Sequence, residues 1–181
     1  MSNDEILDKV DEKGSIIGQA PRSVFHSDPS IIHAVVHCWI FNPKGEILWQ
    51  QRSHKKVQAP GQWDMSSGGH ILSGEKPKET LRRELNEELG LTDVDYELVE
   101  KYVQRHETQT EFVYLYYAII DKDNTDLKLQ KEEVEQVQWI EPSKAQQLVL
   151  DGKIDSTDFI FTQITKILRF MSIKKGLFKQ D

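Results

Sequence analysis

The chain alternates between short apolar segments and polar turns, and its most apolar stretch covers residues 31–41. β-Branched and aromatic side chains are frequent there, which predicts a buried strand. The sequence Asn42-Pro43-Lys44-Gly45 is typical of a turn, and apolar and polar residues alternate over residues 46–51. We therefore predict a β-hairpin over residues 31–51.

Several further segments have strand-like composition and are bounded by turn residues. They cover residues 5–10, 15–18, 63–69, 96–104, 111–120 and 137–140. The segment 63–69 ends in a Gly68-Gly69 pair, where the missing side chains let the backbone approach a ligand closely.

Helical periodicity is clearest over residues 77–89, where leucines recur every four positions at Leu81, Leu85 and Leu89. Pro77 suits the first turn of a helix, because proline lacks the N–H that the first turn leaves unpaired. Gly90 suits the position just past the end, where a left-handed backbone is common. These signals predict a helix over residues 77–89.

Two further helices are predicted at residues 142–150 and 157–171, so the elements indicate one α/β domain with a mixed sheet between helices. With 181 residues, of which 38% are hydrophobic, the chain is long enough to bury its own core. We expect an N-terminal β extension over residues 1–30, the main domain over residues 31–172 and a frayed tail over residues 173–181.

The formal net charge of -7 excludes the basic surface of a general nucleic-acid-binding protein. No run of about 18 apolar residues is present, and the N-terminal sequence lacks a basic leader followed by an apolar stretch. The single cysteine, Cys38, cannot form an internal disulfide. We expect a cytoplasmic protein that binds no nucleic-acid polymer and no membrane.

Three carboxylates stand at i, i+3 and i+4 in the predicted helix, at Glu84, Glu87 and Glu88. They project from one face, and like charges at this spacing destabilise a helix unless a cation shares them. No lysine or arginine follows in the next turn, so we expect a bound metal, and clustered hard oxygen ligands suit Mg²⁺ or Mn²⁺. The alternative is a solvated acidic face, which leaves the neighbouring glycines unexplained.

The region from residue 69 to residue 91 resembles, position by position, the signature of the Nudix hydrolases. The matching residues are Gly69, Glu75, Arg83, Glu84, Leu85, Glu87, Glu88, Gly90 and Leu91. The resemblance implies the Nudix-type α/β/α sandwich, here with extra N-terminal strands and a C-terminal helix. It further implies that Glu84, Glu87 and Glu88 bind the cations, with the backbone carbonyl of Gly69 as a further ligand. Glu75 and Arg83 would form a structural ion pair.

Such a site supports attack of water on a diphosphate phosphorus, because two cations can neutralise the non-bridging oxygens and lower the pKa of the water. A carboxylate within reach of the water could accept its proton. Three candidates for this general base remain open, namely Glu88, Glu111 and Glu133.

Much of residues 5–75 is similar to one branch of the family, that of isopentenyl-diphosphate isomerase. The similarity includes Ile32-His33-Ala34, Gln51-Arg52-Ser53 and Pro60-Gly61-Gln62-Trp63. It implies a second metal site at His26, His33 and His70 together with Glu111, and diphosphate binding by Arg52 and Lys56. Structural or substrate-contacting roles for the three histidines are the alternative.

The chain departs from the isomerases at two positions. Gly68 stands where the isomerases carry a catalytic cysteine, and Cys38, in the first core strand, reads as a buried structural residue. Gln109 stands near a metal-binding acid of the isomerases and cannot be an anionic ligand. His37, His54 and His106 match no motif.

The leading hypothesis is therefore a hydrolase that cleaves the diphosphate linkage of a nucleoside diphosphate derivative or a similar small organic diphosphate. One alternative is an isomerase of the isopentenyl-diphosphate type. The other is a non-catalytic nucleotide-binding module, although such modules usually lose box carboxylates and none is lost here. The N-terminal strands and the C-terminal helix offer surfaces for a homodimer.

Overall fold

A computed structural model describes residues 4–151 and 159–174 of the chain. The strands are β1 (Ile6–Val10), β2 (Ile16–Pro21), β3 (Ile32–Phe41), β4 (Ile47–Arg52), β5 (Trp63–Asp64), β6 (Ser67–His70), β7 (Tyr96–Arg105), β8 (Thr110–Ile119) and β9 (Val134–Ile140). The helices are α1 (Arg22–Phe25), α2 (Pro77–Leu89), α3 (Pro142–Leu150) and α4 (Phe159–Lys174).

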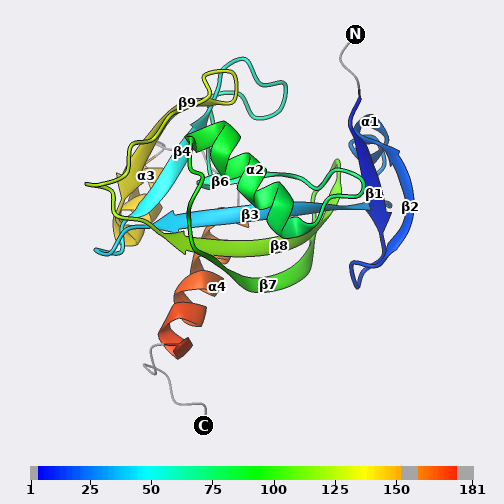
Figure 1. Cartoon of the computed structure of the whole chain (residues 1–181). Helices are drawn as coiled ribbons and strands as arrows, with labels where there is room; N and C mark the ends of the chain where they lie inside the picture. Colours follow the sequence, from blue (N-terminus) through cyan, green and yellow to red (C-terminus); the bar gives the residue numbers. More distant parts are fainter. Residues whose placement is uncertain (1–3, 152–158, 175–181) are drawn as a thin grey trace.

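Strand β3 is the centre of a mixed sheet (Figure 1). All ten of its residues are buried, as its apolar sequence predicts. It pairs in parallel with β8 over its full length and antiparallel with β6, β1 and the start of β4. The register places His33 opposite Glu111 and His37 opposite Gly68. Cross-strand partners lie on the same face of a sheet, so segments far apart in sequence meet here.

Alternate residues of β3 face two different layers of helix. Ala34, Val36, Cys38 and Ile40 belong to one core cluster, together with Leu81, Leu85 and Leu89 of α2. Val35, Trp39 and Phe41 belong to a second cluster, together with Ile160, Ile164 and Ile167 of α4. The sheet therefore lies between helices in an α/β/α arrangement (Figure 1), as the sequence predicts.

Helix α2 covers the predicted residues because local signals set both of its ends. Pro77 occupies the first turn, and Gly90 ends the helix with a φ of 72°, a left-handed conformation that glycine adopts readily. Its leucine stripe is completely or almost completely buried. The acidic face of the helix is thereby turned away from this core.

Some predicted boundaries need correction. Residues 63–69 form two short strands, because the Ser66 hydroxyl donates to the carbonyl of Leu48 and accepts from the N–H of Ile40 between them. Helix α4 includes Ile173 and Lys174, which were expected in the tail, and residues 175–181 lie outside the described part of the chain. The predicted start of this helix, at residue 157, also lies outside the described part of the chain.

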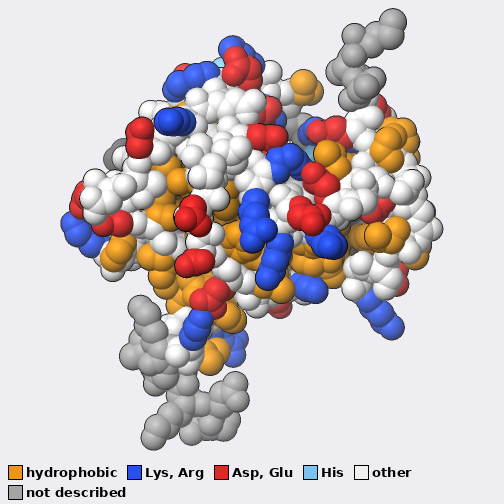
Figure 2. Space-filling model, viewed as in Figure 1, with side chains coloured by type: hydrophobic (Ala, Val, Ile, Leu, Met, Phe, Trp, Pro, Cys, Tyr) orange, Lys and Arg blue, Asp and Glu red, His pale blue; other side chains and the backbone are white. Residues whose placement is uncertain are grey.

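The segment before β3 joins the main sheet. β1 pairs with β2 on one side and with β3 on the other, and the short α1 leads from β2 toward β3. None of the helices within residues 4–151 and 159–174 combines the length and apolar character needed to cross a bilayer. On the face shown in Figure 2, lysine and arginine side chains are interspersed with acidic ones.

Candidate active site

A cavity of about 680 Å³ is lined by α2, the glycine pair of β6, and parts of β3, β4, β8 and α4. Most residues that the sequence singled out line it together. They are His26, Arg52, Lys56, Gly69, His70, Arg83, Glu84, Glu87, Glu88, Glu111 and Glu133. Two others, His33 and Glu75, are not part of the cavity wall but contact residues that are.

The glycine pair of β6 lets the carboxylates of α2 reach this cavity. A Cβ atom at residue 69 would lie 2.0 Å from Oε1 of Glu84, so only glycine leaves room for that carboxylate. The backbone N–H of Gly68 donates to Oε2 of Glu88 at 3.3 Å. A Cβ atom at residue 68 would lie 2.9 Å from the carbonyl oxygen of Val36. Neither position accepts a side chain without movement of its neighbours.

Burial makes two of the three helix carboxyl groups weak acids. Desolvation raises the pKa of Glu84 to about 7, against the opposing attraction of Arg83. Desolvation and the neighbouring charge of Glu84 raise the pKa of Glu88 to about 8. A cation placed between these oxygens would favour their charged forms. The donor set, three carboxylates beside a side-chain-free backbone, therefore fits Mg²⁺ or Mn²⁺.

The expectation that only a metal could supply the positive charge between the carboxylates of α2 is wrong, because Arg83 lies among them. Its Nη1 lies 2.8 Å from Glu84 Oε1 and 3.3 Å from Glu87 Oε2, so a cation from the preceding turn already shares the acidic face. Its Nε and Nη2 bind the two oxygens of Glu75, each at 3.1 Å. The Glu75–Arg83 ion pair thus ties the loop before α2 to the helix. The spacing of the carboxylates alone does not require a metal.

Basic side chains enter the cavity from β4 and the loop after it. Arg52 lies 3.4 Å from Asp64 and donates to the carbonyl of Gln58, which holds the loop against β4. Lys56 forms an ion pair with Glu133, which directly precedes β9. Both cations have acidic partners here and could exchange them for the oxygens of an anionic ligand.

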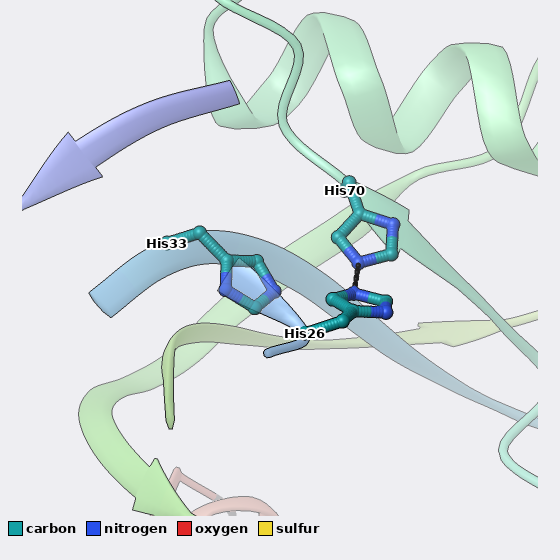
Figure 3. Close-up of side chains that lie close together, drawn as sticks. All are labelled: His26, His33 and His70. Carbon is teal, nitrogen blue, oxygen red and sulfur yellow. Dashed lines mark hydrogen bonds between the residues drawn. The ribbon is translucent and has the colours of Figure 1, made fainter. Parts of the chain in front are cut away.

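Three histidine rings gather beside β3 (Figure 3). Nε2 of His26 lies 3.2 Å from Nε2 of His70, and one nitrogen atom from each of the three rings lies within 4.8 Å of the others. Neither ring nitrogen of His33 has a hydrogen-bond partner among the described residues. Desolvation lowers the pKa of His33 to about 4 and also lowers those of His26 and His70, so all three rings are neutral near pH 7.

Glu111 is buried, with 6% exposure, and two histidines that match no motif lie beside it. Its Oε2 lies 3.4 Å from Nε2 of His106 and 4.0 Å from Nε2 of His37, and its Oε1 accepts from Gln109 at 2.8 Å. Hydrogen bonding to His106 and the nearby imidazoles lower the pKa of Glu111 against the effect of burial. The alternation of His33 and His37 on one face of β3 is a sequence signal that could have indicated the second histidine.

Cys38 lies on the other face of β3. It is fully buried in the core cluster that packs under α2, and burial raises the pKa of its thiol far above the ordinary value. A thiol in this position cannot take the place of the isomerase cysteine, because it does not face the cavity.

Comparison with known proteins identifies the family. The model of the NUDIX domain matches residues 32–162. A Nudix hydrolase of Clostridium acetobutylicum without a known activity is 32% identical, and the alignment covers 97% of this chain and 94% of that protein. An isopentenyl-diphosphate Delta-isomerase of Corynebacterium efficiens is 30% identical, over 89% of this chain and 86% of its own length.

The fold is also shared with solved structures. The crystal structure of a protein from Deinococcus radiodurans superimposes with a TM-score of 0.76 at 23% sequence identity, and the match covers 89% of this chain and 98% of that one. The signature residues, the α/β/α arrangement and the matched domain all indicate the same family. The chain therefore belongs to the Nudix family, whose members are in general hydrolases of phosphorus-containing anhydrides.

Proposed function

We propose that this protein hydrolyses the diphosphate linkage of a nucleoside diphosphate derivative or a similar organic diphosphate, with Mg²⁺ or Mn²⁺ as cofactor. The observation that carries the proposal is the shared cavity, which the carboxylates of α2 line together with Arg52 and Lys56. A volume of about 680 Å³ suits a ligand of nucleotide size.

Glu84, Glu87 and Glu88 would hold the cations. Bound divalent ions supply charge to the diphosphate oxygens and lower the pKa of a water molecule. Arg52 and Lys56 would bind phosphate oxygens and so orient the linkage. Arg83 would hold the carboxylates of α2 in place, through the contacts that it makes with Glu75 on one side and with Glu84 on the other. Water then attacks phosphorus, the bridging P–O bond breaks, and the proton passes to a general base.

Among the three candidate bases we favour Glu133. Glu88 would be a metal ligand, and both oxygens of Glu111 already have partners in Gln109 and His106. Glu133 is paired with Lys56, a residue that we expect to turn toward the substrate. Loss of that partner would leave the Glu133 carboxylate free to accept a proton.

His26, His33 and His70 form a candidate second metal site. Two unpartnered nitrogens on a buried ring, beside two more neutral imidazoles, suit a transition metal such as Mn²⁺ or Zn²⁺. Titration of the protein with Zn²⁺ in a calorimeter, against a His33→Ala variant, tests the site. Equal affinities would show that the histidines have a structural role.

The isomerase alternative is disfavoured by the backbone at residue 68. The catalytic cysteine of that branch would need a Cβ atom 2.9 Å from the carbonyl oxygen of Val36. The module alternative is disfavoured because each box carboxylate is retained and the three of α2 line the cavity. A cytoplasmic location and a small-molecule substrate remain predictions.

The proposal is tested by chromatographic detection of the monophosphate products from a panel of nucleoside diphosphate derivatives and alkyl diphosphates, with and without Mg²⁺. We expect metal-dependent hydrolysis that Glu87→Gln abolishes while the circular-dichroism spectrum is unchanged. Glu133→Gln should lower kcat and leave metal affinity intact, whereas Glu132→Gln, an exposed neighbour, should have no effect. Tight nucleotide binding without turnover would favour the binding module instead.

A further inference from the structure

Helix α4 forms part of the cavity wall through Phe159, far from the box carboxylates in sequence. The Phe159 ring lies 5.8 Å from the ring of His37, nearly parallel to it, and 5.7 Å from the ring of His106, nearly perpendicular. Phe159 is neither fully buried nor fully exposed. A partly buried aromatic ring in a cavity wall is suited to contact a ligand ring.

The position of Phe159 is fixed by the next turn of the same helix. Gln163 is completely buried, and its Oε1 accepts from the indole N–H of Trp39 at 2.9 Å. Its Nε2 lies 2.7 Å from Nδ1 of His37 and 2.9 Å from the hydroxyl of Tyr102. Since Phe159 and Gln163 are four residues apart, they lie on one face of α4. The hydrogen bonds of Gln163 thus hold the turn of α4 that carries Phe159 against the sheet.

Gln109 also lines this cavity, and its amide oxygen is shielded from solvent. Gln109 donates through Nε2 to Oε1 of Glu111 at 2.8 Å. A carboxylate only accepts, so this contact fixes which way the amide of Gln109 points. Its Oε1 has no hydrogen-bond partner among the described residues. An acceptor left without a partner in a buried setting favours a ligand that brings an N–H donor.

We propose that Phe159 and Gln109 form the subsite for a nucleobase with an exocyclic amino group, such as adenine or cytosine. Phe159 contacts the face of the base, and Oε1 of Gln109 accepts from the amino group. An alkyl chain would offer neither a flat π-face nor a donor. This inference rests on the proposed function, because it identifies the organic group attached to the diphosphate.

Binding of nucleoside monophosphates tests the subsite without requiring turnover. In the presence of Mg²⁺, calorimetry should give higher affinity for AMP than for IMP, and for CMP than for UMP, because the second of each pair carries a carbonyl oxygen in place of the amino group. Ribose 5-phosphate should bind more weakly than all four. Phe159→Leu should reduce AMP affinity by roughly ten-fold, the usual effect of losing one base–aromatic contact.

Gln109→Leu should make the affinities for AMP and IMP equal while the protein remains folded. Phe161→Leu is the matched control, because Phe161 lies on the same helix but packs against Trp49, in the core. Equal binding of AMP and ribose 5-phosphate by the wild type, or unchanged AMP affinity in Phe159→Leu, would overturn the inference. A protein that binds AMP through Phe159 but hydrolyses no diphosphate would contradict the proposed function and support this subsite.

Discussion

Glu88 links the acidity of a single carboxyl group to the stability of the fold. Burial raises its pKa from the ordinary 4.5 to about 8, so between these values the folded chain holds a proton that the unfolded chain has lost. The stabilisation from this group is present below pH 4.5 and is lost as the pH rises toward 8. In metal-free protein, the free energy of unfolding should fall with pH by at most about 1.4 kcal/mol per pH unit on account of Glu88.

Urea unfolding of the wild type and Glu88→Gln between pH 5.5 and 8.5, with a chelator present, measures the pH dependence of stability that is due to Glu88. Glutamine cannot ionise, so the variant should gain stability relative to the wild type as the pH rises. Mg²⁺ should restore the wild type at high pH and should act less on the variant. Parallel pH profiles for the two proteins would show that Glu88 is not buried as a weak acid.

The absence of a side chain at Gly69 leaves room for the carboxylate of Glu84. Gly69→Ala would place a methyl group 2.0 Å from the carboxylate of Glu84, which must then turn away. We expect Mg²⁺ affinity to fall roughly 10- to 100-fold, as it does when the support of a metal ligand is removed. Gly18→Ala is the control, since its nearest neighbour, Cβ of Lys9, would be 4.0 Å away. Equal metal affinity in both variants would contradict a ligand role for Glu84.

At the scale of single elements, the sequence predicts the boundaries correctly where residues of the element itself, or directly next to it, determine where it begins and ends. Pro77, the leucine stripe and Gly90 define α2 without help from the rest of the chain. The break between β5 and β6 depends instead on Ser66, which bonds to Ile40 and Leu48, 26 and 18 positions away. His106 was likewise missed, because its contact with Glu111 depends on how β7 and β8 pair. Periodicity in one segment does not carry that information.

The loop between β4 and β5 carries two adjacent lysines in different settings. Lys56 lines the cavity and pairs with Glu133, whereas Lys55 is exposed and pairs with the exposed Glu132. If Lys56 binds the diphosphate, Lys56→Met should raise KM roughly ten-fold, the effect of losing one charge-assisted hydrogen bond. Lys55→Met should leave KM unchanged. Steady-state kinetics at matched ionic strength distinguish the two, and equal KM values would remove Lys56 from the substrate site.

At the scale of the whole molecule, helices on both faces of the sheet and the segment before β3 contribute residues to the candidate site. α2 supplies carboxylates, α4 supplies Phe159, and the segment before β3 supplies His26, all on one cavity. The acidic surface charge would repel an anionic substrate at long range, so binding depends on the local arginine, lysine and metal charges. The segment before β3 therefore contributes to the site as well as to the sheet.

β2 lies at the edge of the sheet. Among residues 4–151 and 159–174 it pairs only with β1, and its sequence Ile16–Pro21 contains no charge. The exposed fractions of Ile16 and Ile17 are 64% and 58%, and Figure 2 shows hydrophobic side chains on this side of the molecule. Uncharged edges with apolar side chains tend to pair with another strand. We therefore predict that a second copy of the chain covers β2.

Light scattering after size-exclusion chromatography should give the mass of a homodimer at micromolar concentration. Ile17→Lys places a charge on the edge and should shift the protein to the monomer, since charged side chains discourage strand pairing. Val57→Lys is the control, because Val57 is 98% exposed but lies in the loop after β4, away from β2. If the wild type is a monomer, or if both lysine variants dissociate equally, β2 is not the interface, and the bare edge must be tolerated because the strand is short.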